Sequence, residues 1–208
     1  MARAPRDNSH LFEHDEELFK TFGYVCGTDE AGRGPLAGPV FAAAVVFEPG
    51  TRIEGLDDSK KLTEKKREKL FDEIIEKALA YHIEPAEVSE IEEKNILNAS
   101  LSAMRRSADA LGVFPGIVLI DGSMCRGFEG YNAQALVKGD AKSAAVAAAS
   151  VLAKVSRDRY MVALDEICPG YGFAAHKGYP TAAHYEAIKR LGISKHHRPS
   201  FLKNLDTK

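Results

Sequence analysis

The sequence predicts an α/β or α+β fold in which helices cover a β-sheet. Short runs rich in valine, isoleucine, phenylalanine and alanine are bounded by glycine and proline, which is typical of strands. Longer stretches place apolar residues at helical spacing, and they alternate with or follow the strands along the chain. With 208 residues, 45% of them hydrophobic, the chain can build one full core without a disulfide or a metal to support it.

Four segments have the composition of strands. The first two, 24–28 and 40–47, flank a glycine- and proline-rich segment at 32–39, so two strands around a tight turn are expected. A short strand is expected at 81–84. The run GIVLI at 116–120 predicts a compact, fully apolar strand.

Four other segments have helical patterns. Residues 58–80 predict an amphipathic helix with a charged face in solvent, and residues 89–111 carry a single apolar stripe. The alanine-rich segment 141–167 predicts a long helix packed closely on the sheet, and 181–191 predicts a short one. The first twenty residues fit a frayed start or a short helix.

The composition excludes a uniformly basic nucleic-acid coat and an acidic disordered tail, because the formal net charge is only −2. The charge is nevertheless uneven. Residues 138–208 hold 12 basic and 6 acidic side chains, together with four of the seven histidines. A basic face that binds a polyanion and a merely uneven distribution over helix surfaces both remain open at this point.

Cysteine usage and hydropathy indicate a soluble, cytoplasmic protein. The three cysteines, Cys26, Cys125 and Cys168, are odd in number and form no C-x-x-C pair, which disfavours a disulfide framework and a zinc knuckle. The N-terminus lacks the apolar stretch of a secretory signal. The longest clean apolar runs, 41–47 and 144–149, are far shorter than the ~20 residues that span a bilayer.

Carboxylates stand at the points where functional groups gather in α/β sheets. Asp29 and Glu30 end the first strand, Asp121 ends the strand at 116–120, and Asp140 begins the alanine-rich helix. Although adjacent strand residues point to opposite faces, the turn after Glu30 can bring both carboxylates to one edge. If the four converge, they need protons or hard divalent cations, and oxygen ligands favour Mg²⁺ or Mn²⁺. Taken singly, each fits a turn or a helix cap.

The segment Gly32-Arg33-Gly34 lets the backbone approach a ligand and aim N–H groups at an anion or a hydroxyl. With Ala37 it also matches the G-x-G-x-x-A pattern of dinucleotide-binding proteins. We reject that interpretation, because a strand-like run rather than a helix follows and because Asp29 would repel a pyrophosphate. A plain tight hairpin is the alternative.

Two further features fit nucleic-acid contacts. Tyr179 lies next to His176 and Lys177, so it could stack on a sugar or a base while the cations hold phosphate. Lys142 and Ser143 begin the alanine-rich helix, where a phosphate could bind. An ordinary loop and a solvated helix face are the alternatives.

Five blocks occur in one order along the chain: DEAGRGPLAGPV (29–40), DDSKKL (57–62), LIDG (119–122), KGDAKS with AAASVLAKVSRDRYM (138–161), and GYGF with HKGYPT and a further histidine (170–184). Together they resemble the type 2 ribonuclease H family, ribonuclease HII. Each motif alone is modestly specific, whereas five in order are highly specific. The resemblance covers residues 24 to about 200, without a departure at a catalytic position.

The resemblance implies a ribonuclease-H-like α/β fold, a mixed sheet flanked by helices with a small helical C-terminal portion. It implies an N-terminal extension at 1–21, a catalytic domain at 22–168 and a substrate-binding portion at 169–208 within the same compact unit. The implied activity is endonucleolytic hydrolysis of the RNA strand of RNA–DNA hybrids and incision 5′ of ribonucleotides embedded in DNA. It leaves 3′-hydroxyl and 5′-phosphate ends, uses two Mg²⁺ or Mn²⁺ ions, and belongs to ribonucleotide excision repair and DNA replication.

The resemblance also implies residue roles. The metal-binding catalytic carboxylates would be Asp29, Glu30, Asp121 and Asp140. The loop Gly32, Arg33 and Gly34 would read the ribose 2′-hydroxyl, and Tyr179 would stack on the adjacent deoxyribose. Phosphate contacts would come from Ser59, Lys60, Lys142 and Ser143.

No membrane and no obligate protein partner is implied, so a monomer is expected. His176 is the nearest candidate for a general base beside the metals. Two rival functions are a non-catalytic nucleic-acid-binding protein on the same fold, which retention of all four acids disfavours, and a dinucleotide-dependent oxidoreductase.

Overall fold

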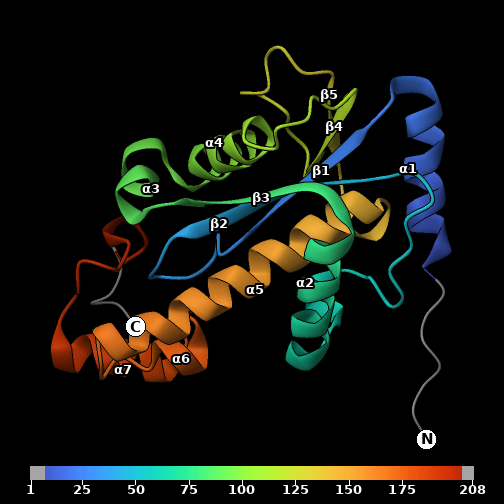
Figure 1. The fold of residues 1–208 in the computed structure, drawn as a ribbon. Coiled ribbons are helices and arrows are strands. Elements are labelled where there is room, and N and C mark those ends of the chain that lie inside the picture. Colours follow the sequence, from blue (N-terminus) through green and yellow to red (C-terminus); the bar gives the residue numbers. More distant parts are fainter. Residues whose placement is uncertain (1–7, 203–208) are drawn as a thin grey trace, which may run out of the picture.

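The computed structural model describes residues 8–202, in which a single five-stranded sheet separates two layers of helices (Figure 1). The strands stand in the order β3-β2-β1-β4-β5. The β1–β2 and β2–β3 pairs are antiparallel, whereas β1–β4 and β4–β5 are parallel, so the sheet is mixed as expected. The strands are β1 (Val25–Ala31), β2 (Val40–Phe47), β3 (Ala78–Ala86), β4 (Ile117–Asp121) and β5 (Ala133–Leu136).

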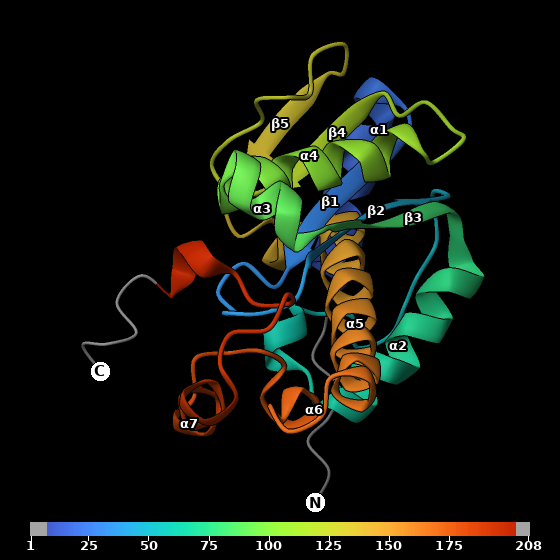
Figure 2. The same cartoon turned by 90° about the vertical axis from the view of Figure 1, so that its left-hand side faces the viewer.

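Helices α3 and α4 cover one face of the sheet and α5 with α2 covers the other, while α6 and α7 lie beyond the sheet near the end of α5 (Figures 1 and 2). The helices are α1 (Ser9–Phe22), α2 (Glu64–Lys77), α3 (Val88–Lys94), α4 (Ile96–Asp109), α5 (Ala144–Ile167), α6 (Phe173–His176) and α7 (Ala182–Leu191). Three short 3₁₀ turns complete the structure: η1 (Ser59–Lys61), η2 (Gly139–Ala141) and η3 (Pro199–Phe201).

Strand β2 is buried on both faces of the sheet and contributes to two apolar clusters. Ala43 and Val45 belong to the apolar cluster under α5, whereas Ala42 and Ala44 belong to the cluster under α4. Because strand side chains alternate between faces, a strand buried on both sides needs a continuous apolar run. The run at 40–47 supplies it.

The alanine-rich helix packs as closely on the sheet as the sequence predicts. A Cβ atom added to Gly27 of β1 would lie 2.2 Å from the carbonyl carbon of Ala145 and the nitrogen of Val146. Only a residue without a side chain fits at this point. Glycine in the strand and alanine in the helix therefore bring the two backbones together.

Several segments differ from the sequence prediction: β5 was not expected, and the helix expected at 58–80 is confined to α2 (Glu64–Lys77). The helix expected at 89–111 is two helices, because Asn95 takes a positive φ of 66° and its side chain accepts hydrogen bonds from the N–H groups of Leu97 and Asn98. Asparagine is found at positive φ more often than most other residues and is a good cap. The strand expected at 81–84 is longer, extending over Ala78–Ala86, and its Pro85 is tolerated because β3 is an edge strand.

The helix expected to start at 141 begins later, at Ala144. Ser143 is its N-cap and accepts a hydrogen bond from the N–H of Val146. Asp140 therefore does not begin α5, but lies in the preceding turn η2.

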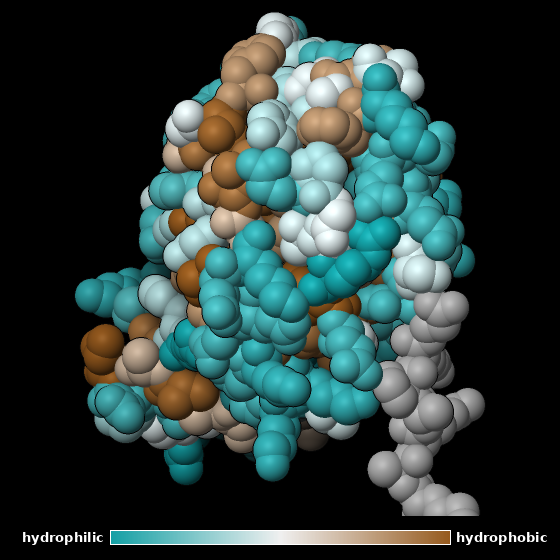
Figure 3. All heavy atoms as spheres, turned by 45° about the vertical axis from the view of Figure 1, so that its right-hand side comes forward, coloured by the Kyte–Doolittle hydropathy of each residue, from teal (hydrophilic) through white to brown (hydrophobic). Residues whose placement is uncertain are grey.

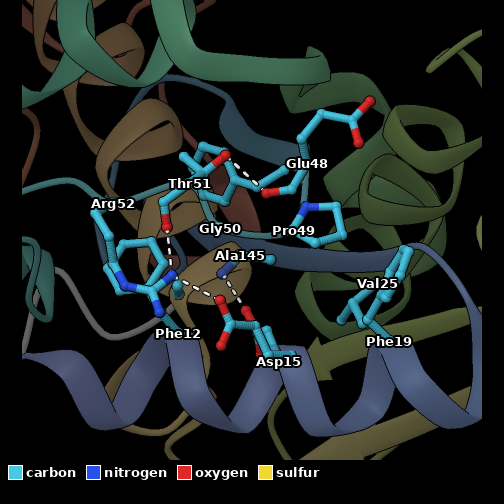
Figure 4. A pocket seen from close by; sticks show the side chains of 13 residues that line it. Phe12, Asp15, Phe19, Val25, Glu48, Pro49, Gly50, Thr51, Arg52 and Ala145 are labelled. Carbon is cyan, nitrogen blue, oxygen red and sulfur yellow. Dashed lines mark hydrogen bonds and ion pairs between the residues drawn. The ribbon is translucent and has the colours of Figure 1, made fainter.

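The N-terminal segment is a well-packed helix in its described part. Leu11 and Phe12 of α1 are buried in the core under α5, while the outer face around α1 is mostly polar with apolar patches between (Figure 3). The carboxylate of Asp15 accepts hydrogen bonds from the Ala145 N–H at 2.8 Å (Figure 4) and from the Ser143 hydroxyl at 3.0 Å. Thus α1 caps the first turn of α5.

None of the helices between residues 8 and 202 is both long and apolar enough to cross a membrane.

Replacing Asp15 with alanine removes both of these hydrogen bonds from the start of α5. We expect the free energy of unfolding to fall by about 1–2 kcal/mol, the usual effect of losing a helix cap. Urea unfolding followed by circular dichroism measures it. Glu17→Ala is the matched control, because this exposed residue of α1 pairs only with Lys20 among residues 8–202, and its loss costs less than about 0.5 kcal/mol. Equal effects of the two substitutions would contradict a capping role for Asp15.

Candidate active site

The parallel pair β1–β4 brings two of the predicted carboxylates to one edge of the sheet. Thr28 of β1 is in register with Ile120 of β4, so that Asp29 and Asp121, the next residues, follow at the same end. The third carboxylate arrives from β5, the neighbour of β4. After this strand, the N–H of Gly139 donates to Asp121 Oδ1 at 2.7 Å, which holds η2 and its Asp140 against the sheet edge.

Burial and mutual repulsion dominate the electrostatics of this edge. Asp29 is only 3% exposed; burial, followed by repulsion from Glu30 and Asp121, raises its pKa well above the usual value. Burial also raises the pKa of Glu30, against the attraction of Arg33 and with the repulsion of Asp121. Since Asp121 also helps to raise the pKa of Asp140, each of the other three carboxylates lies within electrostatic reach of Asp121.

The pKa of Asp140 has a further contributor. Burial raises it first, then repulsion from Asp58 and from Asp121. Asp58 precedes η1, where its side chain accepts a hydrogen bond from the Lys60 N–H. Asp58 lies in the DDSKKL block, but nothing in its spacing marked it as a site residue.

Two cations compensate the cluster in part. Lys60 Nζ lies 3.6 Å from Asp140 Oδ2 on a side chain that is 77% exposed. Burial lowers the Lys60 pKa, but attraction by Asp29 and Asp140 outweighs it, so the net shift is upward. Arg33 Nη1 lies 3.2 Å from Glu30 Oε1. Lys60, predicted as a phosphate contact, thus stands at the carboxylates with its amine open to solvent.

The donor set fits a hard divalent cation, because it consists of buried oxygen ligands of like charge that lack full compensation. The side chains are not yet gathered: among residues 8–202, no three Asp, Glu, His or Cys side chains form a ready metal-binding group. Strand β1 continues regularly through Ala31, so Asp29 and Glu30 point to opposite faces instead of being turned to one edge. Asp29 Oδ1 also accepts the N–H of Glu30 at 2.7 Å.

A chain of two serine hydroxyls supports Asp29, and the sequence did not reveal it. Ser150 of α5 hydrogen-bonds to Asp29, and the hydroxyls of Ser59 and Ser150 lie 2.7 Å apart. Ser59 is itself buried, at 4% exposure. The structure therefore places Ser59 behind Asp29, away from the surface on which a phosphate contact was predicted.

Of the other two predicted phosphate contacts, one is exposed and one is buried. Lys142 is exposed, but Ser143 is fully buried, and its hydroxyl is taken by the Asp15 carboxylate and the first turn of α5. With Asp15 seated there, the N-terminus of α5 already holds an anion. The structure gives no support to a phosphate at Ser143.

The loop after β1 is shaped by a close approach. Gly32 has a φ of 100°, and a Cβ atom added there would lie 2.0 Å from Arg157 Nε. The loop leads directly into β2 and not into a helix, which confirms the rejection of a dinucleotide fingerprint.

Tyr179 lies beside this loop. A Cβ atom added to Gly34 would be 3.7 Å from Tyr179 Cε1, and the Leu36 N–H donates to the Gly178 carbonyl at 2.8 Å. The guanidinium of Arg157 lies 5.9 Å from the centre of the tyrosine ring, which is itself 40% exposed. The two predicted sugar-contacting elements are therefore neighbours, and the Arg33–Glu30 pair joins them to the carboxylates.

Histidines hold the Tyr179 loop from behind. His184 Nδ1 lies 2.9 Å from the Tyr179 carbonyl and must donate to it, so its Nε2 accepts from His197 Nε2 at 3.1 Å. His197 Nδ1 in turn accepts from the N–H and hydroxyl of Ser194. Burial lowers the pKa of both histidines, that of His197 to about 4, which keeps them neutral as this arrangement requires.

His176 belongs to the same support. Its Nε2 donates to the Tyr171 carbonyl at 2.8 Å and its Nδ1 accepts the Gly178 N–H at 3.2 Å. Both ring nitrogens are engaged by the backbone, so His176 does not serve as the general base for which the sequence made it the nearest candidate.

Comparison with known proteins decides the family. A family model described as Ribonuclease HII matches residues 26–204. The chain belongs to the ribonuclease HII family. It is 50% identical over 200 residues to the Ribonuclease HII of Caldicellulosiruptor bescii, which covers 96% of this chain and 97% of that one. Like the other members of this family, this chain is an endoribonuclease hydrolase that acts on RNA–DNA hybrids.

Two solved structures share the fold. The ribonuclease H2 of Pyrococcus horikoshii OT3 superposes with a TM-score of 0.72 at 26% identity, over 88% of this chain and 97% of that one. The PCNA:RNase HII complex of Archaeoglobus fulgidus gives a TM-score of 0.71 at 26% identity, over 84% of this chain and 93% of that one. The ribonuclease-H-like fold predicted from the sequence is thus confirmed.

Repulsion within the carboxylate cluster predicts that Asp29→Asn stabilises the metal-free protein near pH 7.5. The raised pKa of Asp29 means that ionising it costs more in the folded than in the unfolded chain. Stability therefore falls as pH rises from the unfolded pKa to the folded pKa, and the full cost is present above the folded pKa. The amide keeps the acceptor for Glu30 N–H and removes the charge. Urea midpoints measured in the presence of EDTA should be higher for the variant near pH 7.5 and should approach the original protein at acidic pH. A lower midpoint near pH 7.5 would contradict net repulsion.

Proposed function

We propose that this chain incises duplex DNA on the 5′ side of embedded ribonucleotides and cuts the RNA strand of hybrids, leaving 3′-hydroxyl and 5′-phosphate ends. The observation that carries the proposal is a set of carboxylates around Asp121, whose charge helps to raise the pKa of Asp29, Glu30 and Asp140, beside a glycine loop and an exposed tyrosine. The first group suits metal-assisted phosphodiester hydrolysis, and the second suits recognition of a sugar.

Asp29, Glu30, Asp121 and Asp140 are the residues that would hold two divalent ions, Mg²⁺ or Mn²⁺. Such ions, when bound, lower the pKa of a water nucleophile and stabilise the departing 3′ oxygen. Asp29 is our choice for the ligand shared by both, because it is the most buried of the four and the nearest in chain to Glu30. Its support by Ser150 keeps the carboxylate oriented.

The remaining residues act on the substrate. Lys60 carries an exposed amine beside the carboxylates, where it binds a backbone phosphate. Lys142, which directly follows η2, is also exposed and is a second phosphate contact. The backbone of Gly32–Gly34 reads the 2′-hydroxyl, and Tyr179 stacks on the neighbouring deoxyribose. A site built to hydrogen-bond a hydroxyl rejects the sugar that lacks it, because its polar groups are then left unpaired.

The proposal includes cellular context. The chain acts as a cytoplasmic monomer without an obligate protein partner, in repair of ribonucleotides left in DNA. The neighbour from Archaeoglobus fulgidus was solved in a complex with PCNA, so sedimentation of the protein alone is the measurement that tests the monomer.

Incubation with Mg²⁺ or Mn²⁺ and a duplex that contains one ribonucleotide tests the activity. We expect a single nick 5′ of the ribonucleotide and none in the matched all-DNA duplex. Asp29→Asn should reduce cleavage by at least about 10²-fold, the scale for losing one group that stabilises transition-state charge, while hybrid binding persists. Substantial metal-dependent turnover by this variant would contradict the carboxylate mechanism; failure of the original protein to nick would favour a binding protein.

Tyr179→Ala tests the stacking role. Aromatic stacking on a base is worth ~1–3 kcal/mol, and packing on the deoxyribose is taken as comparable, so activity at a single embedded ribonucleotide should fall about 10- to 100-fold. Tyr179→Phe is the matched control, because it keeps the ring and should retain most activity. Thermal unfolding should change little, since the ring is 40% exposed. Unchanged activity of the alanine variant on the embedded ribonucleotide would refute this role.

A further inference from the structure

Arg198 is a fully buried arginine whose five hydrogen bonds all go to the loop after β1. Its Nε and Nη2 donate to the Gly38 carbonyl at 2.9 and 2.7 Å, and Nη2 also donates to Gly32 at 2.8 Å. Its Nη1 donates to Arg33 at 3.1 Å and to Pro35 at 2.9 Å. One side chain thus binds four carbonyls that lie more than 150 residues earlier in the sequence.

This arrangement is costly. Arg198 is 0% exposed, and within residues 8–202 it forms no ion pair with a carboxylate. Burial, followed by repulsion from Arg157, lowers its pKa to about 9. A buried cation satisfied only by neutral carbonyls is an expensive way to stabilise a fold. A role in shaping the loop accounts for it.

The geometry of the peptide bond shows what Arg198 does to the loop. In a trans peptide, the C=O of one residue and the N–H of the next point in opposite directions, and this chain has no cis peptide among its described residues. Pro35 follows the rule: its carbonyl binds Arg198, while the next N–H, of Leu36, donates to Gly178 on the other side.

The same rule applies to the two peptides before it. The carbonyls of Gly32 and Arg33 bind Arg198, so the N–H groups of Arg33 and Gly34 face away from it. Both residues are exposed, and neither N–H donates to another group within residues 8–202. The loop after Glu30 therefore carries two free N–H donors, and the second of them belongs to Gly34, which lies against Tyr179.

We propose that Arg198 is a positioning residue for sugar recognition: by drawing the carbonyls of Gly32 and Arg33 inward, it presents the N–H groups of Arg33 and Gly34 to the 2′-hydroxyl of the substrate ribose. The inference rests on the proposed function. Arg198 does not touch the substrate itself. Its loss leaves the loop free to turn these peptides over, so discrimination between ribose and deoxyribose falls.

Arg198→Lys is the test, because lysine keeps the charge but its single nitrogen cannot span four carbonyls. In the Asp29→Asn background, which prevents cleavage, affinity is measured for a duplex with one ribonucleotide and for the same duplex with deoxyribose only. Loss of one to two hydrogen bonds predicts that the preference for the ribonucleotide falls about tenfold, with affinity for the all-DNA duplex unchanged. An unchanged preference in a folded variant would overturn the inference.

Arg190→Lys is the matched control. Arg190 also donates to a backbone carbonyl, that of Gly170, but it is exposed and lies outside the loop. It should leave the preference and the cleavage rate unchanged. A fall as large as that of Arg198→Lys would show a general effect of arginine loss and would overturn the specific role.

A second measurement keeps the inference testable if Arg198→Lys does not fold, as judged by circular dichroism. In the ¹⁵N-labelled Asp29→Asn protein with Arg198 intact, the amide signals of Arg33 and Gly34 should shift with the ribonucleotide duplex and not with the all-DNA duplex. Identical responses to the two duplexes would overturn it. If the protein without substitutions neither nicks nor prefers the ribonucleotide duplex, the proposed function itself fails, which is a distinguishable outcome.

Discussion

The close contact between β1 and α5 is the constraint on which the site depends. Gly27 has no side chain, so the strand lies directly on the helix backbone at Ala145. Two residues along the strand is ~6.7 Å, and the four residues from Val146 to Ser150 make about one helical turn, ~6 Å. The face of the strand that meets Val146 at Gly27 therefore meets Ser150 at Asp29, and the buried carboxylate finds its hydrogen-bond partner there.

This placement brings like charges together in a poorly hydrated edge. The parallel pairing with β4 adds Asp121, and the Gly139–Asp121 hydrogen bond adds Asp140. Lys60 and Arg33 compensate only part of the negative charge, from exposed side chains. The raised pKa values of the buried carboxylates express stability that the fold gives up at this edge. Such a cost is expected where a site is built to hold cations.

The loop after β1, which is proposed to read the sugar, is held by side chains from the C-terminal part of the chain. Arg198 donates to carbonyls of this loop, among them that of Pro35, and Arg157 donates to the carbonyls of Ala37 and Pro39. The neighbouring His197 acts through His184 on the Tyr179 carbonyl. The adjacent residues His197 and Arg198 thus support both elements proposed to contact the sugar.

The sequence by itself determined the fold class, the main strands, the alanine-rich helix and the family, because these depend on local composition, spacing and motifs in order. It could not show that Ser143 is sealed under Asp15 or that Ser59 lies behind Asp29, since both contacts join residues about 90 or more positions apart. The roles of Arg198 and His176 were equally hidden. Only the tertiary structure decides whether a polar side chain near a motif faces solvent or a buried backbone carbonyl, because that depends on which distant segment packs against it.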